Sequence, residues 1–371
     1  MKKIFLAAII FLTVANVVHA APQKSWSPEL RIGLQSGVKQ IELEFSAPCI
    51  IIDASTGRVI GKVPAEKILR VDLKDFDFNA LEFRPKEIFL QDLQTTINGK
   101  KYFGGVRLNK VNGALNVINL VPLEEYLRGV VSKEMSPSFP IEALKAQTVA
   151  ARSFAMKNRK RHDNEGFDLC STTHCQVYDG LADYDSIDCA VDDTRGEILM
   201  FRGKIADANF HTDSGGMTED VAEVWGRATP YLVAVKEMFE IVEPWNVKVT
   251  VKDFSSRFGE IGKLKSVTLS PLTIGKATVD RSISGRVKSA QIVGTKKIVT
   301  VTGSDLRRKF SLPSTLFDIQ LDGDKVIFTG YGHGHGVGMS QVGAKSYAND
   351  GWTYEKILAH YYRGAELKKV Y

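Results

Sequence analysis

The stretch from Pro122 to Pro140 constrains the fold of this 371-residue chain most strongly. Its apolar residues recur every three or four positions, which is the spacing of one face of an α-helix. These residues are Leu123, Tyr126, Leu127, Val130 and Val131. Proline is excluded from helix interiors but favoured at helix starts, so Pro137 stops this helix and Pro140 opens another. The pattern predicts one helix over 122–135 and a second from 141 to about 160.

Glu134 lies on the apolar stripe of the first predicted helix, three residues after Val131 and seven after Leu127. A helix therefore turns its carboxylate toward the interior or a cleft. Burial and the negative end of the helix dipole both raise the pKa of a carboxyl group, which favours the protonated form that a general acid needs. The alternative is structural: Glu134 caps the helix end or pairs with Lys133 or Arg152.

The first 20 residues have the features of a secretory signal peptide: a basic start, a short apolar run and small residues before Ala21. No later stretch is long and apolar enough to span a bilayer. We therefore expect export to the periplasm, the cell wall or the exterior. Cleavage removes Lys2 and Lys3 and lowers the net charge from +6 to +4. Without a block of Lys and Arg, nucleic acid is not an expected partner.

The texture of the sequence predicts an α+β fold. Residues 21–112 read as short strands separated by turns, which indicates a β-rich N-terminal region. Residues 113–365 read as a mixed catalytic domain with helices flanking a cleft. Strands return within it at 245–330, which we interpret as an inserted β-rich lobe. This lobe contains the predicted strands Val247–Val251 and Lys297–Val301.

Glycine alternates with other residues from Gly330 to Gly338. An extended backbone there places His333 and His335 on one face. The segment leads into a helix that ends at Asn349–Gly351, and a last helix is predicted from Thr353 to Gly364. The buried edge expected of that last helix is Ile357, Leu358, Tyr361 and Tyr362.

The cysteines allow two interpretations. Cys189 pairs with Cys170 or Cys175 in a disulfide, as export favours. Alternatively, His162, Cys170, His174 and Cys175 bind a structural zinc ion through tetrahedral Cys₂His₂ coordination. From spacing alone both stay open.

A second arrangement of metal ligands is conceivable from the histidines. His211, His333 and His335 together offer the three nitrogens of a catalytic zinc site. No carboxylate stands at the spacing that zinc hydrolases use, so a metallohydrolase is the weaker interpretation.

Taken together, the motifs resemble the signature of the stage II sporulation protein D / amidase enhancer (SpoIID/LytB) family. They occur in family order and cover about residues 115–365. The matching segments are Gly129–Met135, Pro140–Phe154, Gln176–Gly180, His211–Gly216, Ser284–Val287, Ser314–Phe317 and Gly334–Gln341.

The resemblance implies a peptidoglycan-binding protein whose enzymatic relatives are lytic transglycosylases. Such an enzyme cleaves the bond between N-acetylmuramic acid and N-acetylglucosamine and leaves a 1,6-anhydro end. The catalytic glutamate of the family matches Glu134. The family's zinc loop is similar to the region of His162, Cys170, His174 and Cys175, which favours structural zinc over a disulfide. No cofactor is implied for catalysis.

The expected partners are peptidoglycan glycan strands, including strands stripped of peptides, and a cell-wall amidase. The residues expected to contact the glycan are Arg152, Tyr178, His211, Ser214, Gly215, Gly216, His335, Ser340 and Gln341. The alternative is a non-catalytic amidase enhancer or cell-wall scaffold, which keeps the cleft but needs no acid.

Overall fold

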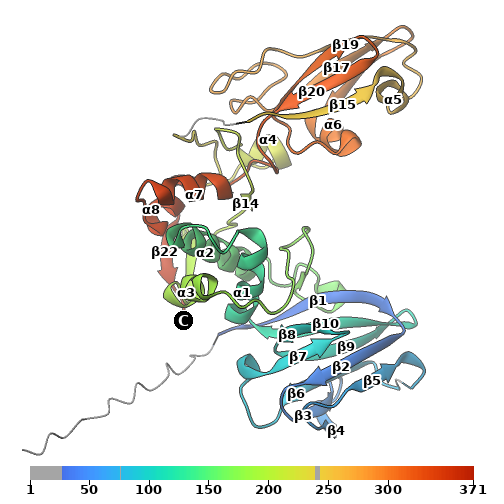
Figure 1. Ribbon diagram of the computed structural model, residues 1–371, viewed down its shortest axis with the longest axis vertical. Helices are drawn as coiled ribbons and strands as arrows, with labels where there is room; N and C mark the ends of the chain where they lie inside the picture. The colour runs from blue at the N-terminus through green and yellow to red at the C-terminus, as the bar shows by residue number, and fades with distance from the viewer. Residues whose placement is uncertain (1–26, 76, 239–242) are drawn as a thin grey trace, which may run out of the picture.

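The computed structural model describes residues 27–75, 77–238 and 243–371. The predicted signal peptide, residues 1–20, lies outside this part of the chain. The fold is α+β, as predicted, and it is elongated (Figure 1): the N-terminal sheets lie at one end, helices lie in the middle, and a second β-rich lobe lies at the other end. Within the described residues, no helix has the length and apolar character needed to cross a membrane.

The N-terminal strands form two sheets, ordered β11-β1-β10-β9-β6-β3-β4 and β5-β2-β7-β8. The two sheets pack face to face, and Phe45 of one stacks on Phe83 of the other with ring centroids 5.7 Å apart. The strands are β1 (Glu29–Val38), β2 (Gln40–Phe45), β3 (Cys49–Asp53), β4 (Arg58–Val63), β5 (Leu69–Asp72), β6 (Ala80–Pro85), β7 (Gln94–Ile97), β8 (Lys100–Phe103), β9 (Gly105–Val111), β10 (Ala114–Pro122) and β11 (Leu169–Cys170).

Strand β10 connects this sheet to the helices. It lies between β1 and β9, and its last six residues are all buried. Phe167 covers Ile118 and Leu120 on one face, while Val117 and Val121 join the main core. That core continues without interruption from the N-terminal strands into the central helices. The first central helix is therefore fixed to the sheet at its start.

Two central helices, α1 (Leu123–Glu134) and α2 (Ile141–Lys157), begin directly after Pro122 and Pro140, which confirms both predicted starts. Gly129 of α1 is needed for packing, since a Cβ there would lie 2.4 Å from the carbonyl oxygen of Gly180. The smaller elements around these helices are α3 (Asp185–Asp193), α4 (Val221–Trp225), α7 (Gln341–Asn349), α8 (Tyr354–Tyr361), β12 (Glu197–Phe201), β13 (Lys204–Ile205), β14 (Phe210–His211), β21 (Met339–Ser340) and β22 (Glu366–Lys369).

The two C-terminal helices also agree with the sequence. Helix α7 ends at the predicted Asn349, and its cap Ser340 accepts a hydrogen bond from the amide of Gly343. Helix α8 begins after Thr353, as predicted. The predicted buried edge of α8 is confirmed at Ile357, Leu358, Tyr361 and Tyr362.

The second lobe has a hydrophobic core of its own, in which Phe254, Phe310 and Phe328 pack together. Two sheets, β15-β20-β19 and β16-β17-β18, surround it. The predicted strand 247–251 is slightly displaced, because Thr250 caps a helix that starts at Val251. The elements are β15 (Trp245–Thr250), α5 (Val251–Ser256), β16 (Leu264–Thr268), β17 (Ser289–Gly294), β18 (Ile298–Thr302), α6 (Gly303–Phe310), β19 (Phe317–Asp322) and β20 (Lys325–Gly330).

The glycine-rich segment after β20 forms a loop, so the sharing of one face by His333 and His335, which holds only for an extended backbone, does not apply. Gly332, Gly334, Gly336 and Gly338 have φ angles of 69°, 109°, 86° and 72°, in a region that side chains disfavour. These repeated positive φ angles give the loop an irregular backbone, so its side chains do not alternate between two faces as they do in a strand.

Candidate functional site

A cavity of about 560 Å³ lies where α1, the Cys/His loop and the glycine-rich loop meet. The sequence-predicted site residues that line it are Glu134, His174, Cys175, His211, His335 and Gln341. Strands β14 and β21 pair in parallel beside it and bring His211 next to Ser340. The cavity therefore joins segments that are more than 200 positions apart in the sequence.

Glu134 is the last residue of α1, and its half-buried carboxyl group faces this cavity. One carboxyl oxygen accepts a hydrogen bond from the Val177 amide and the other from Nε2 of Gln341, both at 3.3 Å. Burial raises the pKa of Glu134 above its ordinary value, and these two donors offset part of the rise. The group is thus biased toward its protonated form.

The ion-pair alternative for Glu134 does not hold. Lys133 pairs with Asp179 at 2.8 Å, and Arg152 pairs with Glu124 at 2.7 Å. In the described part of the chain no Lys or Arg side chain forms an ion pair with Glu134. Its environment is desolvated and contains neutral donors, which distinguishes it from a structural salt bridge.

His211 and His335 also line this cavity, with ring centroids 5.5 Å apart. Burial lowers the pKa of both imidazoles, to about 4 for His335, so both are neutral near pH 7. Nδ1 of His211 lies 3.1 Å from the carbonyl oxygen of Val337 and donates to it. Its Nε2 has no hydrogen-bond partner among the described residues and remains an acceptor.

Ser214, Gly215 and Ser340 support the wall from behind. Ser214 is buried and donates its hydroxyl to Glu237 at 2.6 Å. Gly215 turns toward Leu316, where a Cβ would lie 2.7 Å from the leucine side chain. Ser340 caps α7 and thereby positions Gln341 beside Glu134. These residues, and Gly216 next to them, are absent from the cavity lining, so the structure gives them a positioning role.

Arg152 and Tyr178 are also absent from the cavity lining. The Arg152 side chain is fully buried and makes two hydrogen bonds with Glu124, at 2.9 and 2.7 Å. Tyr178 is buried and donates its hydroxyl to Asn119 at 2.9 Å. Their expected contact with glycan is therefore corrected: both residues hold the helices and the sheet together.

The structure adds cavity residues that sequence reasoning missed, among them Asn158, Asp207, Asn209 and Trp225. Asp207 is a second carboxylate, and the amide of Asn158 lies 3.4 Å from it. Trp225 is 52% exposed, and its ring lies 5.3 Å from that of His335. No local sequence signal marks Asp207 or Trp225, because both reach the cavity through tertiary packing.

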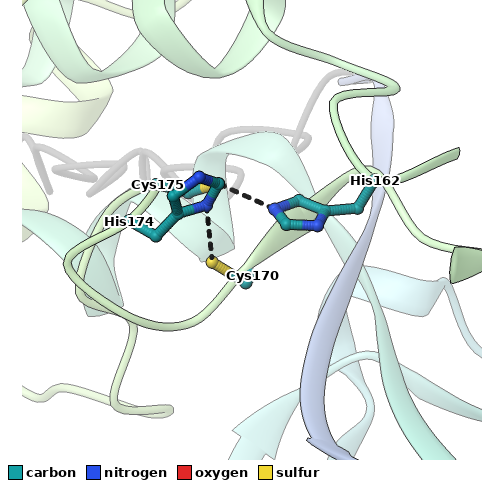
Figure 2. A group of neighbouring side chains, drawn as sticks. All are labelled: His162, Cys170, His174 and Cys175. Atoms are coloured by element: carbon teal, nitrogen blue, oxygen red, sulfur yellow. Dashed lines mark hydrogen bonds between the residues drawn. The ribbon is translucent and has the colours of Figure 1, made fainter.

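Figure 2 shows the Cys/His loop, where His162, Cys170, His174 and Cys175 converge. All four ligand atoms lie within 4.8 Å of one another. The Cys175 sulfur is 3.4 Å from Nε2 of His162 and 3.7 Å from Nδ1 of His174, and the Cys170 sulfur is also 3.7 Å from that Nδ1. Tetrahedral zinc separates such ligands by roughly 3.3–3.8 Å. The donor set and its spacing therefore fit zinc.

The surroundings of this loop also suit a metal ion. Nδ1 of His162 lies 2.6 Å from Glu165, which orients the ring with Nε2 toward the cysteines, as carboxylate partners do in zinc sites. All four cysteines lie in described segments and all are free thiols, so neither predicted disulfide is formed. Cys49 is buried in the N-terminal sheets and Cys189 is exposed on α3.

The alternative site of three histidines does not assemble. His333 pairs its backbone with Asp213 and is absent from the cavity lining, unlike His211 and His335. Among the described residues, the Cys/His loop alone gathers three or more metal-binding side chains.

Comparisons with known proteins identify relatives of this chain. The family model for stage II sporulation protein matches residues 111–201, and a domain model of unknown function matches residues 235–338. An uncharacterised protein of Brachyspira hyodysenteriae is 34% identical over 279 residues, which cover 73% of each chain. Stage II sporulation protein D of Bacillus subtilis is 34% identical over 67% of this chain and 75% of its own length. The amidase enhancer of Bacillus subtilis is 28% identical over 91% of this chain and 53% of its own length.

Proposed function

This chain belongs to the stage II sporulation protein D family, and on that premise we propose that it is a peptidoglycan lytic transglycosylase with Glu134 as its acid and base. The family supports a cell-wall-related function. The observation that carries the finer proposal is the environment of Glu134: a half-buried carboxyl group in a large cavity, held by two neutral amides and, among the described residues, paired with no Lys or Arg. A general acid needs this combination of access and raised pKa.

In the proposed reaction, protonated Glu134 donates its proton to the oxygen that links N-acetylmuramic acid to N-acetylglucosamine. The bond between that oxygen and C1 of the muramic sugar breaks, and C1 becomes cationic. The sugar's own 6-hydroxyl oxygen then bonds to C1, and the carboxylate of Glu134 takes the hydroxyl proton. The products are a 1,6-anhydro end and a free 4-hydroxyl, and no water is consumed.

This reaction needs a single carboxyl group because the nucleophile is part of the substrate. Hydrolysis needs two, one of which activates water or forms a covalent intermediate. Asp207 lines the same cavity, so the chain does offer a second carboxylate. The chemical identity of the new sugar end decides between the two reactions.

Two groups on the cavity wall suit a sugar. Nε2 of His211 is a buried acceptor without a partner among the described residues, and a substrate hydroxyl satisfies it. Trp225 presents an exposed ring, on which a sugar face can stack. The neutrality of His211 and His335 suits hydroxyl and acetamido groups, which carry no charge.

We also propose that His162, Cys170, His174 and Cys175 bind zinc. Bound there with four protein ligands, the ion supplies structural rigidity. Its role is to hold the loop that contributes His174, Cys175 and Val177 to the cavity. Because the Val177 amide donates to Glu134, the loop also sets the position of the acid.

A non-catalytic enhancer is the second candidate, favoured by the similarity to the amidase enhancer over 91% of this chain. In that case the cavity binds glycan and a cell-wall amidase performs the cleavage. Export of the mature protein is part of both proposals.

The deciding experiment is mass spectrometry of glycan released by the mature protein and by Glu134→Gln. Peptide-bearing and peptide-free strands are digested in parallel. We expect 1,6-anhydro-muramic ends from the wild type and none from the variant. Wall binding without release from either substrate contradicts the transglycosylase and supports the enhancer. Reducing muramic ends indicate hydrolysis.

A further inference from the structure

A second, smaller cavity of about 50 Å³ lies beside the cavity of Glu134. His335 lines both. The cationic residues around the smaller one, Arg286, Lys288 and Arg307, all come from the β-rich lobe. A single water needs at least about 10–15 Å³, so this space holds a small polar group and is too small for a sugar ring.

Arg286 is the central residue of this small cavity. Its side chain is 2% exposed, and its Nη2 donates to the carbonyl oxygen of Ser214 at 2.7 Å. Nε and Nη1 have no hydrogen-bond partner among the described residues. Burying an arginine with unused donors is unfavourable, and arginine does not escape by losing its proton. Burying Arg286 with two unpaired nitrogens therefore costs free energy. A ligand that accepts hydrogen bonds from these nitrogens removes that cost.

The acidic neighbours of Arg286 do not use these donors. Glu219 lines the small cavity, but its carboxylate accepts the hydroxyls of Ser282 and Ser284 and the amide of Asp220. Glu223 is the other acidic residue of the lining, and its side chain is exposed to solvent.

The lining of this cavity carries three cationic and two acidic side chains, a formal net charge of +1. Burial is the largest cause that lowers the pKa of Arg286, to about 10; the charge of Arg307 lowers it further, while Glu219, Asp213 and Glu237 raise it. Burial, Arg286 and Arg307 together lower the pKa of His335 to about 4.

We propose that Arg286, Arg307 and Lys288 form a carboxylate-binding subsite for the glycan substrate. The planar fork of an arginine matches a carboxylate, and buried charge-assisted hydrogen bonds favour it strongly. This inference rests on the proposed function, because it assumes a peptidoglycan strand in the neighbouring cavity. Such a strand offers two sources of carboxylate: the lactyl group of a muramic sugar without peptide, and the peptide stem.

Binding measurements on the mature chain with Glu134→Gln test the subsite without turnover. The probes are a peptide-free muramic tetrasaccharide, its methyl ester, a peptide-bearing tetrasaccharide, its methyl ester, and a neutral chito-oligosaccharide of equal length. We expect at least one of the two free-acid tetrasaccharides to bind about tenfold more tightly than its methyl ester. A preference seen with the peptide-free acid identifies the lactyl group, and one confined to the peptide-bearing acid identifies the stem.

Substitutions assign the preference to residues. Arg286→Gln also removes the bond to Ser214, so a folding defect would confuse its result. Arg307→Gln and Lys288→Gln change half-buried residues and are expected to reduce the preference for acid over ester to less than about threefold. Arg308→Gln is the matched control: it lies next to Arg307 on α6, its side chain is 78% exposed, and it should keep the preference.

Equal binding of acid and ester by the unsubstituted subsite overturns the proposal. So does a preference that survives both Arg307→Gln and Lys288→Gln. These results are independent of cleavage. If the protein releases no anhydro product but prefers the free-acid tetrasaccharide, the transglycosylase is refuted and the subsite is supported. If it releases anhydro products but shows no preference, the transglycosylase is supported and the subsite is refuted.

Discussion

The Arg152 site in the helical core and the walls of the two cavities treat buried polar groups in different ways. Arg152 makes two hydrogen bonds with Glu124 and further ones with the carbonyl oxygens of Val191 and Glu197. In the cavity walls, Nε2 of His211 and two nitrogens of Arg286 have no partner among the described residues. All three side-chain nitrogens of Arg152 are thus used by internal hydrogen bonds, whereas these wall nitrogens can still bind a ligand.

Burial and a shifted pKa therefore do not identify a functional residue by themselves. Burial raises the pKa of Glu237 just as it raises that of Glu134. However, Glu237 is enclosed and accepts the hydroxyls of Ser214 and Tyr361 at 2.6 and 2.5 Å. Glu134 has longer bonds of 3.3 Å to two amides and faces a cavity. Access to the cavity and longer hydrogen bonds distinguish Glu134 from Glu237.

The largest effect is expected from Glu134→Gln, which removes the acid but keeps the shape of the side chain. The rate of anhydro-product formation should fall by about 10²–10⁴-fold, the usual contribution of general acid–base catalysis. Asp207→Asn should lower it by less than about tenfold, since the transglycosylase needs one carboxyl group. Equal losses in the two variants would instead support hydrolysis with two carboxylates.

Arg152→Met tests the hydrogen-bonded Arg152 site in the helical core. Without its cation, Glu124 becomes an unpaired buried charge, so the free energy of unfolding should fall by about 3–5 kcal/mol. Arg308→Met, at an exposed ion pair, should change it by less than about 1 kcal/mol. Denaturant unfolding of the mature protein measures both. If Arg152→Met kept its stability but bound glycan poorly, the sequence-based assignment of Arg152 to the glycan would be restored.

Cys175→Ser tests the proposed zinc site. Loss of one of four ligands should lower the free energy of unfolding by at least about 2 kcal/mol, because structural metal binding contributes directly to folding. A chelator should lower the unfolding temperature of the wild type and have little further effect on the variant. Cys189→Ser, at an exposed thiol, is the control. Full stability and activity in Cys175→Ser, with no zinc in the purified wild type, would refute the site.

Trp225→Ala tests whether the exposed tryptophan ring on the cavity wall binds glycan. Because the ring is 52% exposed, its removal should leave stability unchanged while glycan binding weakens about tenfold. Calorimetric titration with a neutral chito-oligosaccharide measures this directly. Phe89→Ala removes another exposed ring, 74% accessible and outside the cavity lining, and should have no effect on binding.

The smallest expected effect is the pH dependence of stability and activity that arises from Glu134. The folded-state pKa of Glu134 is raised above its ordinary 4.5, so the associated stability is fully present below pH 4.5 and is lost as pH rises through the raised value. Wild type should therefore lose stability relative to Glu134→Gln across that window, and activity should fall with the protonated fraction. A stability difference that is independent of pH would indicate that burial does not shift this pKa.

Local signals made much of the fold predictable. Proline residues fix the starts of α1 and α2, and Ser340 and Thr353 precede α7 and α8. The four residues of the Cys/His loop also lie close together in the sequence. Each of these features depends on a few neighbouring residues, whose conformational preferences act wherever the segment ends up.

The remaining features depend on tertiary contacts. Asp207, Trp225 and Arg286 reach the cavities through packing between segments far apart in the sequence, and no local pattern predicts that placement. The conformation of the glycine-rich loop also escaped prediction, because alternation alone does not report φ. Arg152 lies four residues after Thr148 in α2, so the two side chains share one face of the helix, and both are buried.

The connection between the two ends of the molecule has a consequence for how such a protein diversifies. The β-rich lobe lies between β14 and β21 in the chain, and those two strands pair with each other. Glu134 and its amide donors come from outside the lobe, whereas Arg286, Lys288 and Arg307 come from within it. Under the roles proposed for these residues, exchanging the lobe would change carboxylate recognition and leave Glu134 and its donors in place.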